Sequence, residues 1–388
     1  MDPRSYVTVF CGSSALVIGT VTTLNYLVDP YLTHQWQTPQ VLRLQPGREK
    51  LSAWGKTYAL AKFKPAVLYA GNSRTELGLP PRAMAFAGQA VFNGALSGAS
   101  LGDAMAMVRH AAQVGQLKTV VWGIDAPSFS MEIGNTDFDR ELVADGPLYL
   151  WRRGLINARR ALSFDMTADS IRLLRGTFGS ACHSSLALYG QRDAVCVRDR
   201  IDSQGGTGAA VAPRVREFIR GAGPTVSATV ALDSSVAALC KAGTVIRLYI
   251  NPTHAMTIDG LYWAGKWPAM EAWQTGLAEL VQRHRSAGCD VRIHDFSGFN
   301  SVTTEAVPQV SKQSDMQYYW ETSHYRSNVG AMIVARMFGR GEAQDDFGVE
   351  LRNDNVAGHL ARMRAARERY HSAHPEETGI VRTVAAER

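Results

Sequence analysis

Short apolar runs alternate with helical segments along most of this chain of 388 residues. The runs typical of buried strands lie at 66–71, 89–96, 118–125, 244–252 and 289–298. Segments with the apolar spacing of helices lie between or after them, at 99–115, 235–243, 269–288 and 328–341. Because strands joined through helices form parallel pairs, the pattern predicts an α/β fold: a three-layer, mostly parallel sheet with helices on both faces. Ligands of such sheets bind at the carboxyl ends of the strands.

The N-terminal region contains a long uncharged run. Between Arg4 and Asp29 lie 24 residues without a charge, which as a helix could cross about 30 Å of hydrocarbon. We expect a short cytoplasmic end at 1–5 and a single transmembrane anchor at 6–28, since Arg4 favours a cytoplasmic N-terminus. The chain would then be a single-pass protein of a bacterial inner membrane that faces the periplasm. A cleaved signal peptide and a buried core helix are the alternatives.

Changes in composition divide the rest of the chain. Residues 29–63 are expected to form a linker, and 64–338 the α/β domain. An irregular insertion at about 131–230 includes a helical pattern and a glycine-rich stretch, and it could cover a site or contact a partner. Residues 339–388 are expected to form an amphipathic helix followed by a disordered tail.

Charge and cysteine content exclude several functions. The net charge of +6 comes from scattered arginines rather than a basic module, so no nucleic acid is expected as a partner. None of the five cysteines forms a Cys-x-x-Cys pair, which excludes a zinc ribbon or thioredoxin motif. Cys182 and Cys196 bracket a loop that suits a disulfide, and Cys240 and Cys289 precede strand-like runs and could be neighbours. Free buried cysteines are the alternative, and we expect no metal and no cofactor.

Two short motifs point to nucleophilic chemistry. Ser73 directly follows the first strand-like run, in Ala-Gly-Asn-Ser-Arg, and Glu321 precedes His324 by three residues in Glu-Thr-Ser-His. A serine becomes a good nucleophile when a base takes its proton and a carboxylate orients that base. Residues three apart can share one face of a turn. The motifs therefore predict a Ser73–His324–Glu321 triad.

In this order on an α/β pattern, the motifs resemble the SGNH hydrolase superfamily, which has a flavodoxin-like fold. The chain looks most like the membrane-anchored branch that includes DltD and the alginate O-acetylation proteins, over roughly residues 64–338. This resemblance implies that Ser73 is the nucleophile, His324 the base and Glu321 the orienting group in place of the usual aspartate. Tyr325 then stands where a proline is common.

The resemblance also implies an oxyanion hole. Its donors would be Ser73 with Gly98, or Gly94 in place of Gly98. Gly123 matches the third conserved block, but Asp125 stands where that block has an asparagine, and a carboxylate there would repel an oxyanion. Either Asp125 has another role, with Asn93 or Asn72 donating instead, or catalysis is weak.

Four further residues are candidates for substrate binding: Arg74, Asp125, Asn251 and His254. Arg74 could hold an anionic group or form a salt bridge. His254 could contact a sugar, with Trp263 and Trp267 nearby, or it could cap a helix.

The resemblance implies a serine acyl-esterase or O-acyltransferase that acts on a cell-envelope polysaccharide or other acylated glycan. A membrane-bound O-acyltransferase would be its partner. The alternative is a catalytically weak scaffold or glycan-binding subunit of a polysaccharide modification system.

Overall fold

The computed structural model describes residues 2–34, 50–178, 183–223, 225–308, 316–341 and 344–387. The strands are β1 (Lys50–Leu51), β2 (Val67–Ala70), β3 (Val91–Asn93), β4 (Thr119–Ile124), β5 (Ser184–Ser185), β6 (Val245–Ile250), β7 (Val291–Asp295), β8 (Tyr319–Glu321), β9 (His324–Tyr325) and β10 (Val349–Glu350). The helices are α1 (Pro3–Val28), α3 (Gly55–Phe63), α4 (Ser73–Gly78), α5 (Leu101–Val114), α6 (Tyr149–Ala161), α7 (Phe164–Leu174), α8 (Val195–Ser203), α9 (Thr207–Gly221), α10 (Val226–Lys241), α11 (Ala255–Trp263), α12 (Trp267–Ser286), α13 (Ser327–Phe338), α14 (Val356–Ala373) and α15 (Pro375–Ala386). Short 3₁₀ turns lie at Met84–Phe86, Ala126–Ser128 and Arg140–Leu142.

The central sheet confirms the predicted α/β class. Its six strands lie in the order β10-β7-β6-β4-β2-β3, and every pair is parallel except β10 with β7. Among the parallel strands the first in the chain, β2, lies between the second and the third. This is the 2-1-3-4-5 order of doubly wound sheets, which bind ligands where the chain direction across the sheet reverses. The reversal falls between β2 and β4, so the ends of these strands are the expected site.

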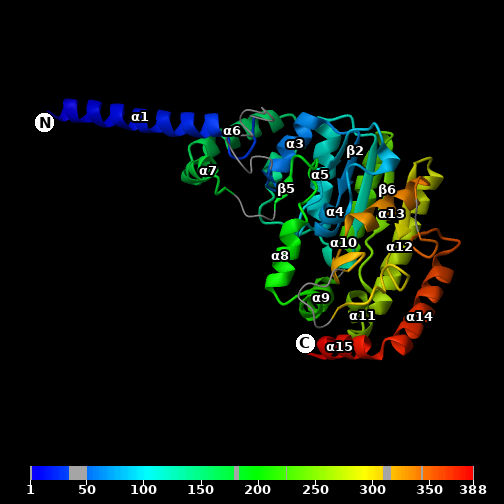
Figure 1. Cartoon of the computed structure of the whole chain (residues 1–388). Helices are drawn as coiled ribbons and strands as arrows, with labels where there is room; N and C mark the ends of the chain where they lie inside the picture. The colour runs from blue at the N-terminus through cyan, green and yellow to red at the C-terminus, as the bar shows by residue number, and fades with distance from the viewer. Residues whose placement is uncertain are drawn as a thin grey trace.

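Alternate residues of the strands pack into two separate apolar clusters. Val67 and Tyr69 of β2 contact one cluster, which includes side chains of α9, α11, α13 and α15. Leu68 and Ala70 contact the other, which includes side chains of α3, α5, α10 and α12. Successive side chains of a strand point to opposite faces, so helices cover both faces of the sheet (Figure 1).

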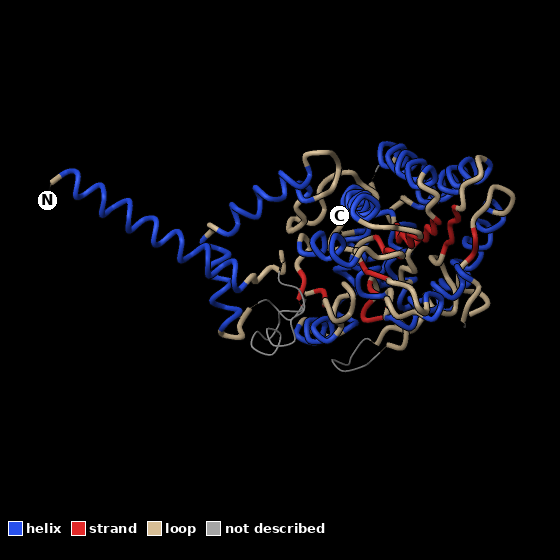
Figure 2. Tube along the Cα trace, turned by 90° about the horizontal axis from the view of Figure 1, so that it is seen from above, coloured by secondary structure: helices blue, strands red, loops and turns tan. Residues whose placement is uncertain are grey.

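Helix α1 is long and apolar enough to cross a membrane, and no residue of its most apolar window is buried. It extends away from the rest of the molecule in both views (Figures 1 and 2). The hydroxyls of Thr8, Thr20 and Thr22 bond to carbonyls one turn earlier, which satisfies these polar groups within the helix. The exposure rules out the alternative of a buried core helix.

The structure corrects two predicted boundaries. Residues 29–63 are more than a linker, because α3 packs into the core with Lys56, Tyr58 and Leu60 fully or almost fully buried. The domain also continues beyond residue 338, because β10 extends the sheet and the tail forms α15. Val381 and Val384 of α15 are buried against α9 and α11, so apolar burial orders a segment whose polar composition suggested disorder.

A disulfide joins Cys240, near the end of α10, to Cys289, just before β7. The predicted neighbours are therefore bonded. The pairing suggested for Cys182 and Cys196 lies outside the described residues, since Cys182 and the Cys196 side chain are not among them.

Two buried histidines are hydrogen-bonded in a way that requires neutral rings. His110 Nε2 donates to Thr57 O, and its Nδ1 accepts from the Ala144 N–H. His254 makes an equivalent pair of backbone bonds. Only a neutral imidazole can donate and accept at once, and burial lowers the pKa of each ring to about 4.

These rings are expected to make the fold sensitive to acid. The unfolded chain binds protons at histidine near pH 6.5, whereas the folded rings do so near pH 4. The free energy of unfolding should therefore fall as the pH is lowered between these values, by about 3 kcal/mol for each ring. Urea unfolding between pH 7.5 and 4.5 measures this, and an unchanged stability would contradict it. The free energy of unfolding should depend less steeply on pH in His110→Gln than in the wild-type protein.

Candidate active site

Ser73 is the first residue of α4 and follows β2 after a two-residue turn. Gly71 in this turn has a φ of +145°, and a Cβ there would lie 2.4 Å from Thr75 Oγ1, so only glycine fits. Asn72 then caps α4, because its side-chain oxygen accepts from the Arg74 N–H at 3.0 Å. The sharp strand-to-helix turn leaves Ser73 partly exposed at the end of β2.

His324 is held next to α4 by close packing at two glycines. His324 begins β9 and is followed by Tyr325. A Cβ on Gly78 would lie only 1.9 Å from Cε2 of the Tyr325 ring. A Cβ on Gly330 of α13 would lie 1.9 Å from Gly78 O. Any larger residue at these positions would push β9 and α13 away from α4. The two glycines therefore set the distance between the histidine and the serine.

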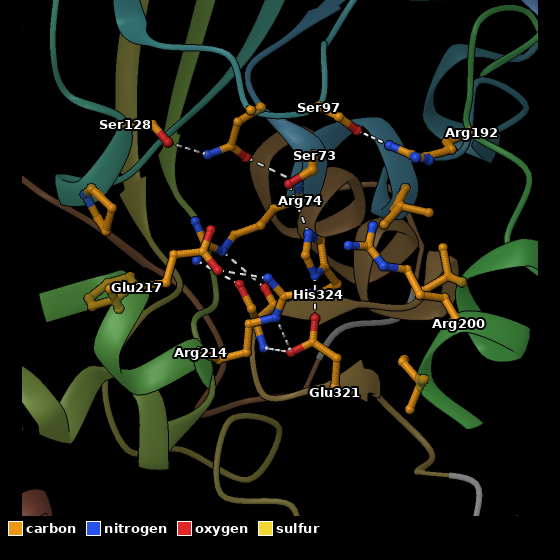
Figure 3. Close-up of a pocket in the computed structure, with 18 of the residues that line it drawn as sticks. Ser73, Arg74, Ser97, Ser128, Arg192, Arg200, Arg214, Glu217, Glu321 and His324 are labelled. Atoms are coloured by element: carbon orange, nitrogen blue, oxygen red, sulfur yellow. Dashed lines mark hydrogen bonds and ion pairs between the residues drawn. The ribbon is translucent and has the colours of Figure 1, made fainter. Parts of the chain in front are cut away.

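The three predicted catalytic residues form a continuous chain of hydrogen bonds (Figure 3). His324 Nε2 lies 2.8 Å from Ser73 Oγ. The other ring nitrogen, Nδ1, is bonded to Glu321 Oε1. With the proton assigned to Nδ1, Nε2 is free to accept the serine proton. This is the geometry of an activated serine.

Glu321 is buried and fully paired. Besides His324, the Ser323 N–H donates to Oε2 at 2.8 Å, and Arg214 Nε lies 3.3 Å from the same oxygen. Burial by itself raises the pKa of the Glu321 carboxyl. The charge and hydrogen bond of His324, with Arg214 and the Ser323 N–H, outweigh burial and hold this pKa at about 2. The carboxylate is therefore ionised throughout the neutral and mildly acidic pH range.

Gly98 and Ser73 line one pocket, but Asn93 does not. Gly98 has a φ of +69°, the left-handed region that favours glycine. The Asn93 amide is buried and donates to Thr75 O at 3.0 Å and Leu79 O at 3.1 Å, so it ties α4 to β3. This corrects the expectation that Asn93 donates to an oxyanion, because its donors are already used inside the fold.

Asp125 follows β4 and serves as a buried partner for cations and amides. It accepts from Arg74 Nη1 at 2.9 Å, Asn72 Nδ2 at 2.7 Å and Asn251 Nδ2 at 3.2 Å. The pocket is lined by Asn72 and Arg74 but not by Asp125 or Asn251. The structure thus corrects their assignment as substrate-binding residues. The pairing with Arg74 also neutralises the charge that would otherwise repel an oxyanion.

Arg74 is fixed rather than free. Its Nε donates to Ser323 O at 2.9 Å and its Nη2 to Ser323 Oγ at 2.8 Å, and the guanidinium lies 5.5 Å from the centre of the Phe218 ring. The salt bridge with Asp125 completes its bonding. Arg74 therefore connects the Ser73 turn to the segment that carries His324. Of the two roles expected for Arg74, the contacts support the salt bridge.

His254 and the two tryptophans lie away from this pocket, which corrects the expectation that they bind substrate. His254 is fully buried and caps α11, with Nδ1 accepting from the Met256 N–H. Trp263 donates to Asp259 and stacks on His371, while Trp267 is buried. The two tryptophans connect α11 and α12 to α14, because Trp263 stacks on His371 and the Arg367 guanidinium lies over the Trp267 ring. His254 instead bonds to Glu305 O.

The pocket around Ser73 has a volume of about 370 Å³ and a basic wall. Three of its arginines come from the region predicted as an insertion: Arg192 precedes α8, Arg200 lies in α8 and Arg214 in α9. Arg192 Nη1 bonds to Ser97 (Figure 3) and lies 3.6 Å from Glu76 Oε2, and its buried Nε has no hydrogen-bond partner among the described residues. Arg200 likewise has no recorded side-chain partner in that part of the chain. The sequence contained no motif that could have identified these arginines.

One group of side chains has metal-ligand spacing. Ligand atoms of Cys240, His284 and Cys289 lie within 4.8 Å of one another. The two sulfurs are joined in the disulfide, so neither is available as a thiolate ligand. The neighbouring pair His294 and Asp295 does not form a second such group among the described residues.

A scan against protein-family models finds no match to this chain, and a search of the curated proteins finds no significant match. The resemblance to SGNH hydrolases therefore stays a prediction from motifs. The functional argument depends on the geometry of the Ser73 pocket.

Proposed function

We propose that the protein is a serine acyl-esterase or O-acyltransferase of the SGNH type. The observation that carries this proposal is the hydrogen-bonded chain from Glu321 through His324 to Ser73, at the end of β2 where a doubly wound sheet binds ligands. The strand order and the helices on both faces support the three-layer arrangement of that superfamily.

In the proposed reaction, Ser73 Oγ attacks the carbonyl carbon of an acyl ester while His324 Nε2 takes its proton. The oxyanion accepts hydrogen bonds from the backbone N–H groups of Ser73 and Gly98. The protonated His324 then gives its proton to the leaving alkoxide, which leaves an acyl group on Ser73. Water or a sugar hydroxyl, deprotonated by His324, attacks the acyl-serine and restores the enzyme.

The membrane-spanning character of α1 and the Cys240–Cys289 disulfide support an extracytoplasmic location. We place the domain in the periplasm, anchored by α1 in a bacterial inner membrane. The substrate would be an acylated glycan or polysaccharide. A membrane-bound O-acyltransferase would supply the acyl donor.

A catalytically weak scaffold is the second candidate. The side-chain amides of Asn72 and Asn93 are both used inside the fold, so the oxyanion hole has no asparagine donor. Loss of one such donor costs about 10²–10³ in rate.

Reaction with a fluorophosphonate probe distinguishes the two candidates. Full-length protein in detergent is treated with the probe and examined by intact mass. We expect one adduct on the wild-type chain that maps to Ser73 and is absent in His324→Ala. No adduct on folded, monodisperse protein would reject the esterase and favour the scaffold.

The basic wall favours substrates with an anionic group near the ester. Arg200 reaches the pocket from α8 without a recorded partner among the described residues, and the Arg192 Nε is buried and unpaired there. A hydrogen bond from a charged group to an anion contributes about 1.5–3 kcal/mol. A carboxylate or phosphate on the substrate would give Arg200 an ion-pair partner, whereas Arg192 already pairs with Glu76.

Arg200→Gln is accordingly expected to lower kcat/KM for an anionic ester by about 10–100-fold, mainly through KM. A neutral ester of the same size should be affected much less. Arg198→Gln is the matched control, because Arg198 lies in the same helix but does not line the pocket. Equal losses with the two esters would contradict an anion-binding role.

A further inference from the structure

Helices α6 and α7 carry two apolar stripes on their exposed faces. Along α6 and the residues that flank it, Leu148, Trp151, Leu155 and Leu162 recur three, four and seven positions apart, and all of them are exposed. Along α7, Phe164, Ile171 and Leu174 recur seven and three positions apart and are also exposed. Trp151 is 74% exposed and Phe164 is 85% exposed. Large apolar side chains that gather in this way on the exposed side of two adjacent helices mark a site of interaction with a protein or a membrane.

The same two helices contact the C-terminal end of α1. Asn25, close to the end of α1, is fully buried there: its Nδ2 donates to Ala161 O at 2.8 Å and to Thr167 Oγ1 at 3.0 Å. Its side-chain oxygen accepts from Ser170 Oγ at 3.1 Å. Helix α7 lies beside the end of α1, with α6 next to it (Figure 1). This polar contact fixes the position of the helix pair relative to the span.

The length of α1 places this contact at the membrane surface. From Pro3 to the residue before Asn25 a helix extends about 33 Å, slightly more than the hydrocarbon thickness. Asn25 and the helices that bind it therefore lie where the span leaves the hydrocarbon. The α6 stripe ends at Leu162 and the α7 stripe starts at Phe164, next to Ala161, whose carbonyl accepts from Asn25.

The charge of the pair suits an anionic lipid surface. The two helices and the residue after α7 contain six arginines: Arg152, Arg153, Arg159, Arg160, Arg172 and Arg175. Some are paired with aspartates, but Arg159 and Arg175 are exposed and have no recorded ion-pair partner among the described residues. Exposed tryptophan and basic side chains beside an apolar helix face are typical of helices that lie in the membrane interface.

We propose that α6 and α7 lie on the bilayer surface around the exit of α1, with Leu155, Trp151 and Phe164 in the headgroup region. The occupant of the two stripes is thus an anionic lipid surface. Two surface contacts and one span would hold the domain in a fixed orientation, instead of leaving it on a flexible tether. This inference rests on α1 as a span and is independent of the chemistry at Ser73.

Photocrosslinking in lipid nanodiscs tests the proposal on the full chain. The photoreactive residue p-benzoylphenylalanine replaces Trp151 or Phe164 in protein reconstituted with phosphatidylcholine and phosphatidylglycerol. Val17, in the middle of α1, is the positive control. Val226, which is 78% exposed at the start of α10, is the matched apolar control away from α1. Irradiation and mass spectrometry should find lipid adducts at Val17, Trp151 and Phe164, and none at Val226.

The controls separate the possible failures. Adducts at Val17 without adducts at Trp151 and Phe164 would overturn the proposal while leaving α1 as an anchor. Absence of adducts at Val17 as well would show that α1 does not span, and would also remove the anchor from the proposed function. Crosslinks at Trp151 and Phe164 to a protein in native membranes, in place of lipid, would overturn the lipid assignment in favour of a subunit interface.

Discussion

Replacing Ser73 with alanine is expected to lower kcat for ester hydrolysis by about 10⁶-fold, the largest effect of any single change in this protein. The alanine removes the hydroxyl oxygen that we propose attacks the ester carbonyl, and it leaves His324 without the proton that it would take. Residual activity would come from polarisation of the ester by the backbone donors at Ser73 and Gly98. The turn itself should be kept, because Asn72 and Gly71 define it.

Hydrolysis of p-nitrophenyl acetate measures this effect, with the melting temperature as a check on folding. Ser234→Ala is the control, since Ser234 is an exposed helical serine of α10 that bonds its own helix and does not line the pocket. A wild-type rate equal to that of Ser73→Ala would show that the serine is not a nucleophile, and would leave the scaffold as the better description.

Glu321→Gln is expected to lower kcat by about 10⁴-fold with a small change in KM. The amide keeps the size of the side chain but removes the charge that stabilises a protonated His324. It can also donate to Nδ1, which would move the ring proton to Nε2, the atom that must accept from Ser73. Arg214 would lose the charge of one of its two partners and keep Glu217.

Glu321→Asp is the informative companion variant, since it restores the charge and leaves a shorter reach. It should recover more activity than Glu321→Gln, whereas equal losses would indicate a purely structural role for Glu321.

Because the pKa of the Glu321 carboxyl is about 2, this group loses its proton far below neutrality. Its stabilising contribution is present above its unfolded pKa of about 4.5 and is lost only as the pH falls towards 2. Any acid limb of activity above pH 5 must therefore have another origin.

Local patterns were sufficient to predict much of the fold. The apolar runs became β2, β3, β4, β6 and β7, and the periodic segments became α5, α10, α12 and α13. The prediction of a disordered C-terminal tail was wrong, because the order of α15 depends on contacts with α9 and α11 that no local pattern contains. For the same reason the burial of α3 could not be predicted from residues 29–63, because it depends on contacts with distant parts of the chain.

The residues of the candidate site also differ in whether the sequence could predict their roles. Ser73, His324 and Glu321 could be proposed from the sequence because each belongs to a short motif with a chemical requirement. The roles of Asp125, Asn93 and His254 could not, because a carboxylate, an amide or an imidazole next to a strand end has the same local signal whether it faces a pocket or the core. The structure assigns these side chains to internal hydrogen bonds.

By itself, the sequence determined which segments could be strands, helices and a membrane span, and which serine, histidine and carboxylate could form a triad. These properties depend on periodicity and on the chemistry of neighbouring residues. Only the tertiary structure decided that Ser73 and His324, which are 251 positions apart, are hydrogen-bonded, and that Arg192, Arg200 and Arg214 form the wall beside them. Such contacts depend on how α4, α8, α9 and β9 pack, which is a property of the whole chain.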